Sequence, residues 1–202
     1  MELVLASHNR FKTEEIRRVL TDAGLKNVNL RLLSDVGFHA DIEESGLTFE
    51  DNAVLKAAVP ASFGWFGLAD DSGLVVDSLG GRPGVFSARF AGEPCNDAEN
   101  NKKLLKEMEA VPDAERTARF VSVIAFADPF DPERSFTVRG ECPGVILREA
   151  RGYDGFGYDP LFYLPSLGKT YAELTTAEKN AVSHRGAAMR LFSEKLKERY
   201  YD

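Results

Sequence analysis

Two aspartates, Asp70 and Asp71, stand side by side in the apolar stretch LADDSGLVVDSLGG, residues 68–81. This stretch predicts a strand, a tight Ser-Gly turn and a second strand. Adjacent like charges at the edge of a core cost free energy unless an opposite charge or a metal compensates them. Successive side chains of an extended segment face opposite sides. We therefore expect one aspartate to face a functional site and the other to face structure or the second rim of a bound metal.

The order of strand-like and helix-like segments predicts a mixed α/β fold. The chain opens with the buried-type strand ELVLA, the loop SHN and a helix whose apolar residues keep helical spacing until Gly24. A second strand is expected at VNLRLL. Two β-rich runs, RTARFVSVIAFADP and RSFTVRGECPGVIL, flank the turn FDPE and predict a long antiparallel hairpin.

Helices are predicted in four further places. One runs from about Thr48 to Ala58, with Pro60 after it. Another begins at Asn96 or Asp97, which can cap it. TTAEKNAV has capping-box spacing. The last helix is expected to begin at a Ser183 cap and to bury Ala188, Leu191, Phe192 and Leu196.

The composition limits the class of protein. The 202 residues fit one domain, or one domain with two lobes. A net charge of -7 argues against the broad basic face that nucleic-acid binding needs, although a local positive site for a small anion remains possible. Cys95 and Cys142 are too isolated for a disulfide framework. Because no run resembles a signal peptide or a membrane span, we expect a cytoplasmic protein without nucleic-acid or membrane partners.

The segment ASHNRFK predicts a seat for phosphate. A loop between a strand and a helix points backbone N–H groups and the positive end of the helix dipole at a ligand, and Lys12 lies in the first turn. The alternative is that Asn9 caps the helix and Lys12 is a solvated lysine. No GxxxxGK[ST] occurs, so this is not a Walker P-loop.

Two acidic pairs, EESG with Glu43 and Glu44 and DDSG with Asp70 and Asp71, are each followed by Ser-Gly. Carboxylates gathered from separate loops hold Mg²⁺, which takes oxygen ligands and leaves positions for water and phosphate. A solvated charge run is the alternative for the glutamates. That alternative is weaker for the aspartates, because they end an apolar strand. We therefore expect Mg²⁺ to compensate the aspartate pair, with Asp70 as a supporting neighbour and outer metal contact.

Three other segments carry candidate ligand groups. Asn52 and Lys56 lie four residues apart on one helix face, where an ordinary exposed pair is the favoured interpretation. The segment GFGYDP offers an aromatic ring that stacks on a base, or else a tight turn that closes a small aromatic core. His184 and Arg185 lie in the first turn of the last helix, where the dipole disfavours cations. A ligand or a structural salt bridge would explain them.

The order of these motifs resembles a known family. ASHNRFK, GLTFEDNAVLKA, ADDSGLVVDSLGGRPGVFSARFAG, GFGYDPLF and AEKNAVSHRG together resemble the inosine/xanthosine triphosphate pyrophosphatase family, from residue 2 to the final helix. The resemblance implies an elongated mixed β-sheet whose flanking helices form two lobes around a central cleft, with residues 1–202 as a single two-lobed domain. It also implies a homodimer and Mg²⁺-dependent hydrolysis of non-standard purine nucleoside triphosphates (dITP, ITP and XTP) to nucleoside monophosphate and pyrophosphate, which cleanses the nucleotide pool.

The resemblance also implies roles for residues. Asp71 would be the proton acceptor, and Glu43 and Asp71 would hold the metal. The implied substrate-binding residues are Ser7, His8, Asn9, Arg10, Phe11 and Lys12 in the first loop, Lys56 and Ser72, and, at the nucleoside end, Phe156, Gly157, Tyr158, Asp159, Lys179, His184 and Arg185. The family's first loop usually reads Thr-Gly-Asn, whereas this chain has Ser7-His8-Asn9. His8 must therefore tolerate backbone strain or contact the ligand itself.

Other functions remain open. A Maf-like nucleotide pyrophosphatase would share the fold and reaction but opens with a Ser-Pro-Arg-Arg type loop that this chain lacks. A non-catalytic nucleotide-binding protein could use the same scaffold, although the presence of Asp71, Glu43 and Lys12 together argues against it.

Arg185 donors would favour the 6-oxo acceptor of hypoxanthine and xanthine over the amino donor of adenine.

Overall fold

The computed structural model describes residues 1–7, 10–25 and 27–201, without the side chains of residues 10 and 11. The chain divides into two compact units, each built from separate stretches of sequence. Unit 1 comprises Met1–Asp71, Ser122–Gly140 and His184–Asp202. Unit 2 comprises Ser72–Val121 and Glu141–Ser183.

The described residues form one mixed sheet of seven strands in the order β2-β1-β3-β4-β5-β6-β7. The strands are β1 (Glu2–Leu5), β2 (Asn29–Leu32), β3 (Phe66–Val76), β4 (Thr117–Ala127), β5 (Phe136–Ile146), β6 (Phe162–Leu164) and β7 (Lys169–Thr170). β1 pairs in parallel with β2 and β3, whereas β6 pairs antiparallel with β5 and β7. The predicted mixed α/β class is confirmed.

The α-helices among the described residues are α1 (Arg10–Asp22), α2 (Phe49–Ser62), α3 (Asp97–Glu107), α4 (Thr176–Val182) and α5 (His184–Tyr200). The short 3-10 helices are η1 (Leu33–Val36), η2 (Asp77–Leu79), η3 (Gly84–Arg89), η4 (Asp113–Glu115), η5 (Pro132–Arg134) and η6 (Tyr171–Glu173). In the described part of the chain, no helix is long and apolar enough to cross a membrane.

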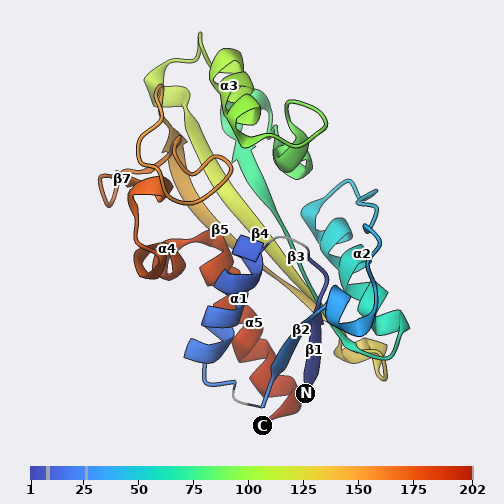
Figure 1. Cartoon of the computed structure of the whole chain (residues 1–202). Helices are drawn as coiled ribbons and strands as arrows, with labels where there is room; N and C mark the ends of the chain where they lie inside the picture. Colours follow the sequence, from blue (N-terminus) through green and yellow to red (C-terminus); the bar gives the residue numbers. More distant parts are fainter. Residues whose placement is uncertain (8–9, 26, 202) are drawn as a thin grey trace. The chain divides into compact units, whose positions relative to one another are not determined.

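In unit 1, the alternation of side chains along β3 selects a different helix for each face. Leu68 is fully buried in a core that includes Ile16 of α1 and Phe192 of α5. The preceding residue, Gly67, faces α2 so closely that a Cβ there would lie 2.0 Å from the carbonyl oxygen of Ala57. Figure 1 shows α1 beside α5 on one side of β1, and α2 on the other. Helices therefore cover both faces of this part of the sheet.

A glycine of β5 sets the position of the start of α5. A Cβ built on Gly140 would lie 2.2 Å from the carbonyl oxygen of His184 and 2.4 Å from the backbone nitrogen of Ala188. Both atoms belong to the helix backbone, which cannot move aside as a flexible side chain can. The first turn of α5, which carries Arg185, therefore rests directly on the strand because residue 140 has no side chain.

Unit 2 has its own core, in which aromatic rings of β4, β6 and η6 cluster. Phe120 packs edge-on against Phe162 with ring centroids 4.6 Å apart, and it stacks on Tyr171 at 5.4 Å. Leu104 and Met108, from α3 and its C-terminal end, are fully buried in the same core. This packing fixes α3 onto unit 2, as the apolar spacing of that helix predicts.

Several sequence predictions are confirmed by the structure. Asn96 caps α3 by accepting a hydrogen bond from the Glu99 N–H at 3.1 Å. Thr175 and Glu178 form the predicted capping box at the start of α4. Gly24 follows α1 with a positive φ of 72°, which suits the predicted stop.

Three local predictions are wrong. β3 is one continuous strand that passes through Ser72 and Gly73 without a turn, because strands on both sides pair with it and override the local Ser-Gly signal. α2 continues through Pro60, which is buried and comes within 3.1 Å of a Cβ built on Gly67. Leu191 is 45% exposed, because it lies on the outer face of α5.

Replacing Gly140 with alanine is expected to lower the free energy of unfolding by about 1–3 kcal/mol or more, since the new methyl group overlaps helix backbone. Urea unfolding followed by circular dichroism measures the change. Thr137→Ala, at an exposed position of the same strand, is the control and should change stability by no more than about 0.5 kcal/mol. Equal stability of Gly140→Ala and wild type would contradict this account of how α5 meets β5.

Candidate active site

Asp70 lies on the α1/α5 face of β3, where three side chains of unit 1 meet its carboxylate. Lys12 of α1 lies 2.7 Å and Arg185 of α5 lies 3.3 Å from Oδ2. The hydroxyl of Ser122, on β4, donates to Oδ1 at 2.6 Å. Burial alone would raise the pKa of Asp70, but Arg185 and Lys12 hold it well below its usual range. Asp70 is therefore an ionised structural group.

Arg185 is held by two carboxylates. Its Nη2 faces Asp70, and its Nη1 forms an ion pair with Glu15 of α1. The guanidinium is buried, which acts to lower its pKa, but Asp70 and Glu15 outweigh burial and raise that pKa above its ordinary value. The result is a permanent cation in a fixed orientation. α1 supplies Lys12 and Glu15 to this charge network, β3 supplies Asp70 and α5 supplies Arg185.

Asp71 lies on the opposite face of the same strand, beside α2. Lys56 Nζ lies 2.6 Å from Asp71 Oδ1 and 2.7 Å from Glu44 Oε1. Burial raises the pKa of Asp71 above its ordinary value, although Lys56 acts in the opposite direction. For Lys56, burial acts to lower the pKa, and the two carboxylates together raise it. The pKa values of the two neighbouring aspartates are thus shifted in opposite directions.

Asn52 connects the acidic loop to Asp71. The side chain is buried, and its Oδ1 accepts a hydrogen bond from the Gly46 N–H at 2.8 Å. Its Nδ2 donates to Asp71 Oδ2 over a longer distance of 3.5 Å. Thr48 caps α2 through a capping box with Asp51, which fixes the start of the helix. The acidic loop therefore approaches Asp71 through contacts made by α2.

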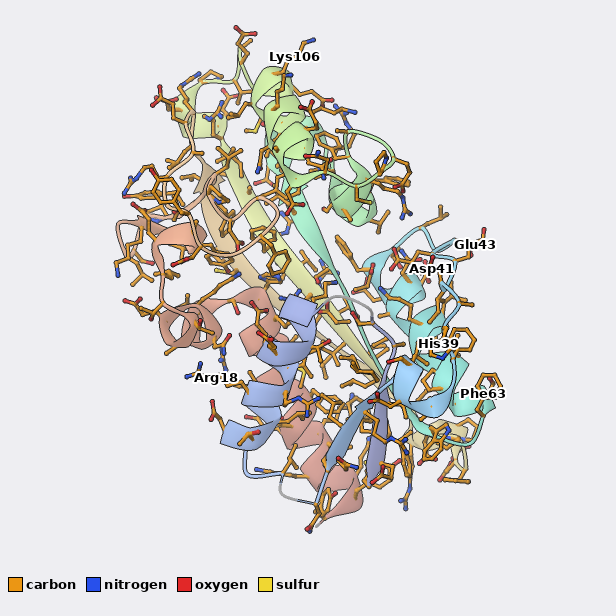
Figure 2. All side chains as sticks on the ribbon, in the orientation of Figure 1. Arg18, His39, Asp41, Glu43, Phe63 and Lys106 are labelled. Atoms are coloured by element: carbon orange, nitrogen blue, oxygen red, sulfur yellow. The ribbon has the colours of Figure 1, made fainter. Side chains whose placement is uncertain are left out.

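The two glutamates of the acidic loop differ in their surroundings. Glu44 is half-buried and contacts Lys56, whereas Glu43 is exposed. Figure 2 shows Glu43 at the outer edge of the loop that also carries His39 and Asp41. The family resemblance implies that Glu43 and Asp71 hold the metal. The carboxylate that shares Lys56 with Asp71 belongs to Glu44.

In unit 2, residues 156–159 form a tightly bonded loop. Asp159 Oδ2 accepts a hydrogen bond from the Phe156 N–H at 3.0 Å and pairs with Lys179 Nζ at 2.7 Å. The Lys179 ammonium also lies 4.9 Å from the centre of the Phe156 ring. Tyr158 is buried and donates its hydroxyl to the carbonyl oxygen of Ser87 at 2.8 Å. The loop is rigidly built around one buried ion pair.

The chemistry of the donors on the α2 face suits a hard cation. Asp71 and Glu44 supply carboxylate oxygens, which Mg²⁺ prefers, and both carboxylates contact the Lys56 ammonium. Among the described residues, no group of three or more His, Cys, Asp or Glu side chains is arranged to hold a metal ion. The Lys56 ammonium also suits a phosphate group, because it offers a positive charge to the phosphate oxygens.

Comparison with known proteins decides the family. A sequence model of the Ham1 family matches residues 3–195. The chain belongs to the Ham1 family. The dITP/XTP pyrophosphatase of Desulforamulus reducens is 51% identical over 201 residues, which cover 99% of this chain and 98% of that protein. The resemblance to pyrophosphatases drawn from the ordered motifs is thereby confirmed.

Solved structures of Ham1 proteins match the fold of this chain. The Coxiella burnetii HAM1 protein is 43% identical, with a TM-score of 0.89 over 98% of this chain and 99% of that one. The Staphylococcus aureus Ham1 protein is 37% identical, with a TM-score of 0.87 over 98% of this chain and 99% of that one. The α/β architecture is therefore that of the Ham1 family.

The residues implied at the phosphate end are only partly described. His8 and Asn9 lie outside the described residues, and Arg10 and Phe11 open α1 without described side chains. Ser7 is half-buried ahead of α1, and Ser72 is half-buried on β3. Lys12 contacts Asp70 and Lys56 contacts Asp71. Each of the two lysines expected to bind phosphate thus forms an ion pair with one of the two aspartates.

The residues implied at the nucleoside end fall into both units. His184 and Arg185 belong to unit 1, and the others belong to unit 2, where Asp159 contacts both Phe156 and Lys179: Phe156, Gly157, Tyr158, Asp159 and Lys179. His184 is buried at the start of α5. Both polar backbone groups of Gly157 are bonded to α3, so this glycine is held by the protein rather than open on all sides.

The structure adds residues that the sequence reasoning did not select. Asn52 was considered with Lys56, but the favoured interpretation of an ordinary exposed pair is wrong, because both side chains are buried. Ser122 is a polar residue inside the apolar run FVSVIAFA, which is a signal of a buried polar contact. Glu15 follows Lys12 at helical spacing, but only the fold shows that it reaches Arg185. The expectation that Mg²⁺ compensates the aspartate pair did not consider the protein's own cations. Lys12 and Arg185 contact Asp70, and Lys56 contacts Asp71.

Removing the charge of Asp70 is expected to destabilise the protein in a pH-dependent way. At neutral pH, Asp70→Asn should lower the free energy of unfolding by about 3–5 kcal/mol, because Lys12 and Arg185 lose their buried partner. The depressed pKa contributes stability above the unfolded value of about 3.9, and this stability is lost as pH falls through the folded pKa. The difference in free energy of unfolding between wild type and Asp70→Asn should therefore become smaller below about pH 4.

Urea unfolding of both proteins at a series of pH values, in the absence of divalent cations, measures this gap. Asp41→Asn, at an exposed carboxylate of unit 1, serves as the control and should leave stability nearly unchanged at every pH. A gap that stays constant from neutral to acid pH would refute the assignment of Asp70 as an ionised structural group.

Proposed function

We propose that this protein hydrolyses dITP, ITP and XTP to the nucleoside monophosphate and pyrophosphate, and so removes non-standard purine nucleotides from the pool. The observation that carries the proposal is Asp71, a buried carboxylate whose pKa is raised and which lies 2.6 Å from Lys56. A carboxylate of this kind suits a general base. The name of the Desulforamulus reducens relative, dITP/XTP pyrophosphatase, supports the reaction and the substrates.

In the proposed reaction, the oxygen of a water molecule attacks the α-phosphorus and the bond from that phosphorus to the bridging oxygen of the β-phosphate breaks. Asp71 accepts the proton of the attacking water, and pyrophosphate leaves with the electron pair of the broken bond. Lys56 stabilises negative charge on the phosphate oxygens and keeps Asp71 ionised enough to act as a base. Lys12 adds positive charge at the start of α1, where Ser7 to Lys12 would bind the triphosphate.

We also propose that the reaction depends on Mg²⁺. Asp71 would hold the ion together with a carboxylate of the acidic loop, Glu43 as the family resemblance implies or Glu44 as its contact with Lys56 favours. When bound, the ion supplies positive charge that neutralises the phosphate oxygens. Asn52 would keep the acidic loop and Asp71 together through its two hydrogen bonds.

The nucleoside end is proposed to contact two groups of residues. In unit 2, Phe156 offers an aromatic face for a base, and Lys179 with Asp159 fixes that loop. In unit 1, Arg185 and His184 would face the base, where a fixed cation favours the 6-oxo acceptor of hypoxanthine and xanthine over the 6-amino donor of adenine. The orientation of Arg185 is set by Glu15 and Asp70.

The remaining parts of the proposal concern the whole protein. Residues 1–202 would act as a single two-lobed domain, in a homodimer and in the cytoplasm. A non-catalytic nucleotide-binding role is the alternative. The raised pKa of Asp71 favours catalysis, because a site that only binds phosphate gains nothing from a buried carboxylate beside its lysine.

Pyrophosphate release should be fast with ITP, dITP and XTP and slow with GTP, ATP and dTTP, when all are assayed with Mg²⁺. Asp71→Asn should lower kcat by about 100- to 10,000-fold, because the proton acceptor is lost. A coupled pyrophosphate assay measures both results. Comparable turnover of ATP or dTTP would refute the substrate assignment, and full activity of Asp71→Asn would refute the proposed base.

Removal of divalent cations should abolish turnover. With EDTA, pyrophosphate release from ITP should fall to background and return when excess Mg²⁺ is added. Mg²⁺ should also raise the melting temperature of the wild type, because an ion that binds only the folded state stabilises it. This thermal shift should be absent in Asp71→Asn. Undiminished activity in EDTA would exclude a metal-dependent reaction.

A further inference from the structure

The backbone N–H and carbonyl groups of Gly157 both form hydrogen bonds with α3, a helix of unit 2. Its N–H donates to Asp97 Oδ2 at 2.7 Å, and its carbonyl oxygen accepts from Asn101 Nδ2 at 2.9 Å. Asp97 and Asn101 lie one turn apart on α3, so they share a face of the helix. Gly157 has a positive φ of 62° and no side chain. α3 therefore holds Gly157 through hydrogen bonds to its backbone N–H and carbonyl groups.

α3 is itself fixed in unit 2 by polar and apolar contacts. Asn100 donates to the carbonyl oxygen of Ala88 at 2.9 Å and accepts from the Ala91 N–H at 2.7 Å, which ties α3 to η3. Leu104 and Met108 fix the other end of the helix in the core of unit 2. α3 is thus held in unit 2 by contacts that do not involve the loop.

The three residues from Gly157 to Asp159 are each held by a different element. α3 holds Gly157, the carbonyl oxygen of Ser87 in η3 accepts from Tyr158, and Lys179 of α4 pairs with Asp159. A Cβ on Gly155 would come within 2.1 Å of Asp159 Oδ2, so the turn before the loop is also closely packed. Phe156, at the head of the loop, receives its orientation from these contacts.

We propose that Asp97 and Asn101 are positioning residues that fix the nucleoside-binding loop 156–159 and thereby set the affinity for the nucleoside part of the substrate. This inference rests on the proposed function, which assigns that loop to the nucleoside end. Neither residue touches the reacting atoms. They act by keeping the loop in its binding conformation, since apparent affinity falls in proportion to the fraction of molecules in the competent state.

The two residues contribute in different ways. Asp97 provides a charged acceptor for a backbone N–H, which is a strong type of hydrogen bond. Asn101 provides a neutral donor to a carbonyl oxygen. Asp97→Asn keeps an acceptor oxygen in place, whereas Asp97→Ala removes it. The conservative variant should therefore keep most of the affinity that the alanine variant loses.

The test compares Asp97→Ala, Asn101→Ala and Asp97→Asn with wild type in ITP hydrolysis. Both alanine variants should raise KM for ITP about 5- to 10-fold, as expected for one lost hydrogen bond, with kcat within about 2-fold of wild type. Asp97→Asn should restore most of the KM. Glu99→Ala is the matched control, because it removes a carboxylate from the same turn of α3 without a contact to the loop.

Inhibition separates loop positioning from a general loss of structure. Inosine monophosphate, which carries the nucleoside, should inhibit the alanine variants about 5- to 10-fold more weakly. Inorganic pyrophosphate, which carries only phosphate groups, should inhibit all variants as it inhibits wild type. An unchanged KM in both alanine variants, or a parallel loss of pyrophosphate inhibition, would overturn the proposal. Wild-type protein without turnover of any purine triphosphate would instead overturn the proposed function and, with it, this inference.

Discussion

The site depends on the alternation of side chains along one strand. β3 is covered by helices on both faces, so a single step along it moves a carboxylate from the α1/α5 face to the α2 face. Asp70 consequently meets Lys12 and Arg185, while Asp71 meets Lys56. A shift of one residue in the pairing of β3 would exchange the two partners. The register of the sheet therefore determines which aspartate is structural and which is available for chemistry.

The two ion-pair networks differ in strength as well as in place. Asp70 accepts contacts from two cations and a hydroxyl, so its burial is fully compensated. Asp71 shares Lys56, the lysine that it contacts directly, with Glu44, so a smaller part of the burial penalty is offset and its pKa is raised. Unequal compensation thus separates two chemically identical neighbours. This is the arrangement by which active sites assign different roles to similar groups.

Sequence patterns predicted much of the fold and part of the site. Strong apolar periodicity and capping residues such as Asn96 marked the helices, and the ordered motifs indicated the family. The errors arose where tertiary contacts outweigh local signals: sheet pairing extends β3 through Gly73, and packing on β3 carries α2 past Pro60. Partners such as Ser122 could not be assigned, because long-range contacts set them and local spacing carries no record of these.

The charge network around Asp70 joins parts of the chain that are made at very different times. Lys12 comes early in synthesis, whereas Arg185 follows Asp70 by 115 residues and lies in the last helix. The ribosome must therefore release the start of α5 before the buried carboxylate can meet both of its cations. Because an incompletely paired buried charge opposes compaction, the N-terminal part of unit 1 gains its full stability only when α5 docks and completes the charge network around Asp70.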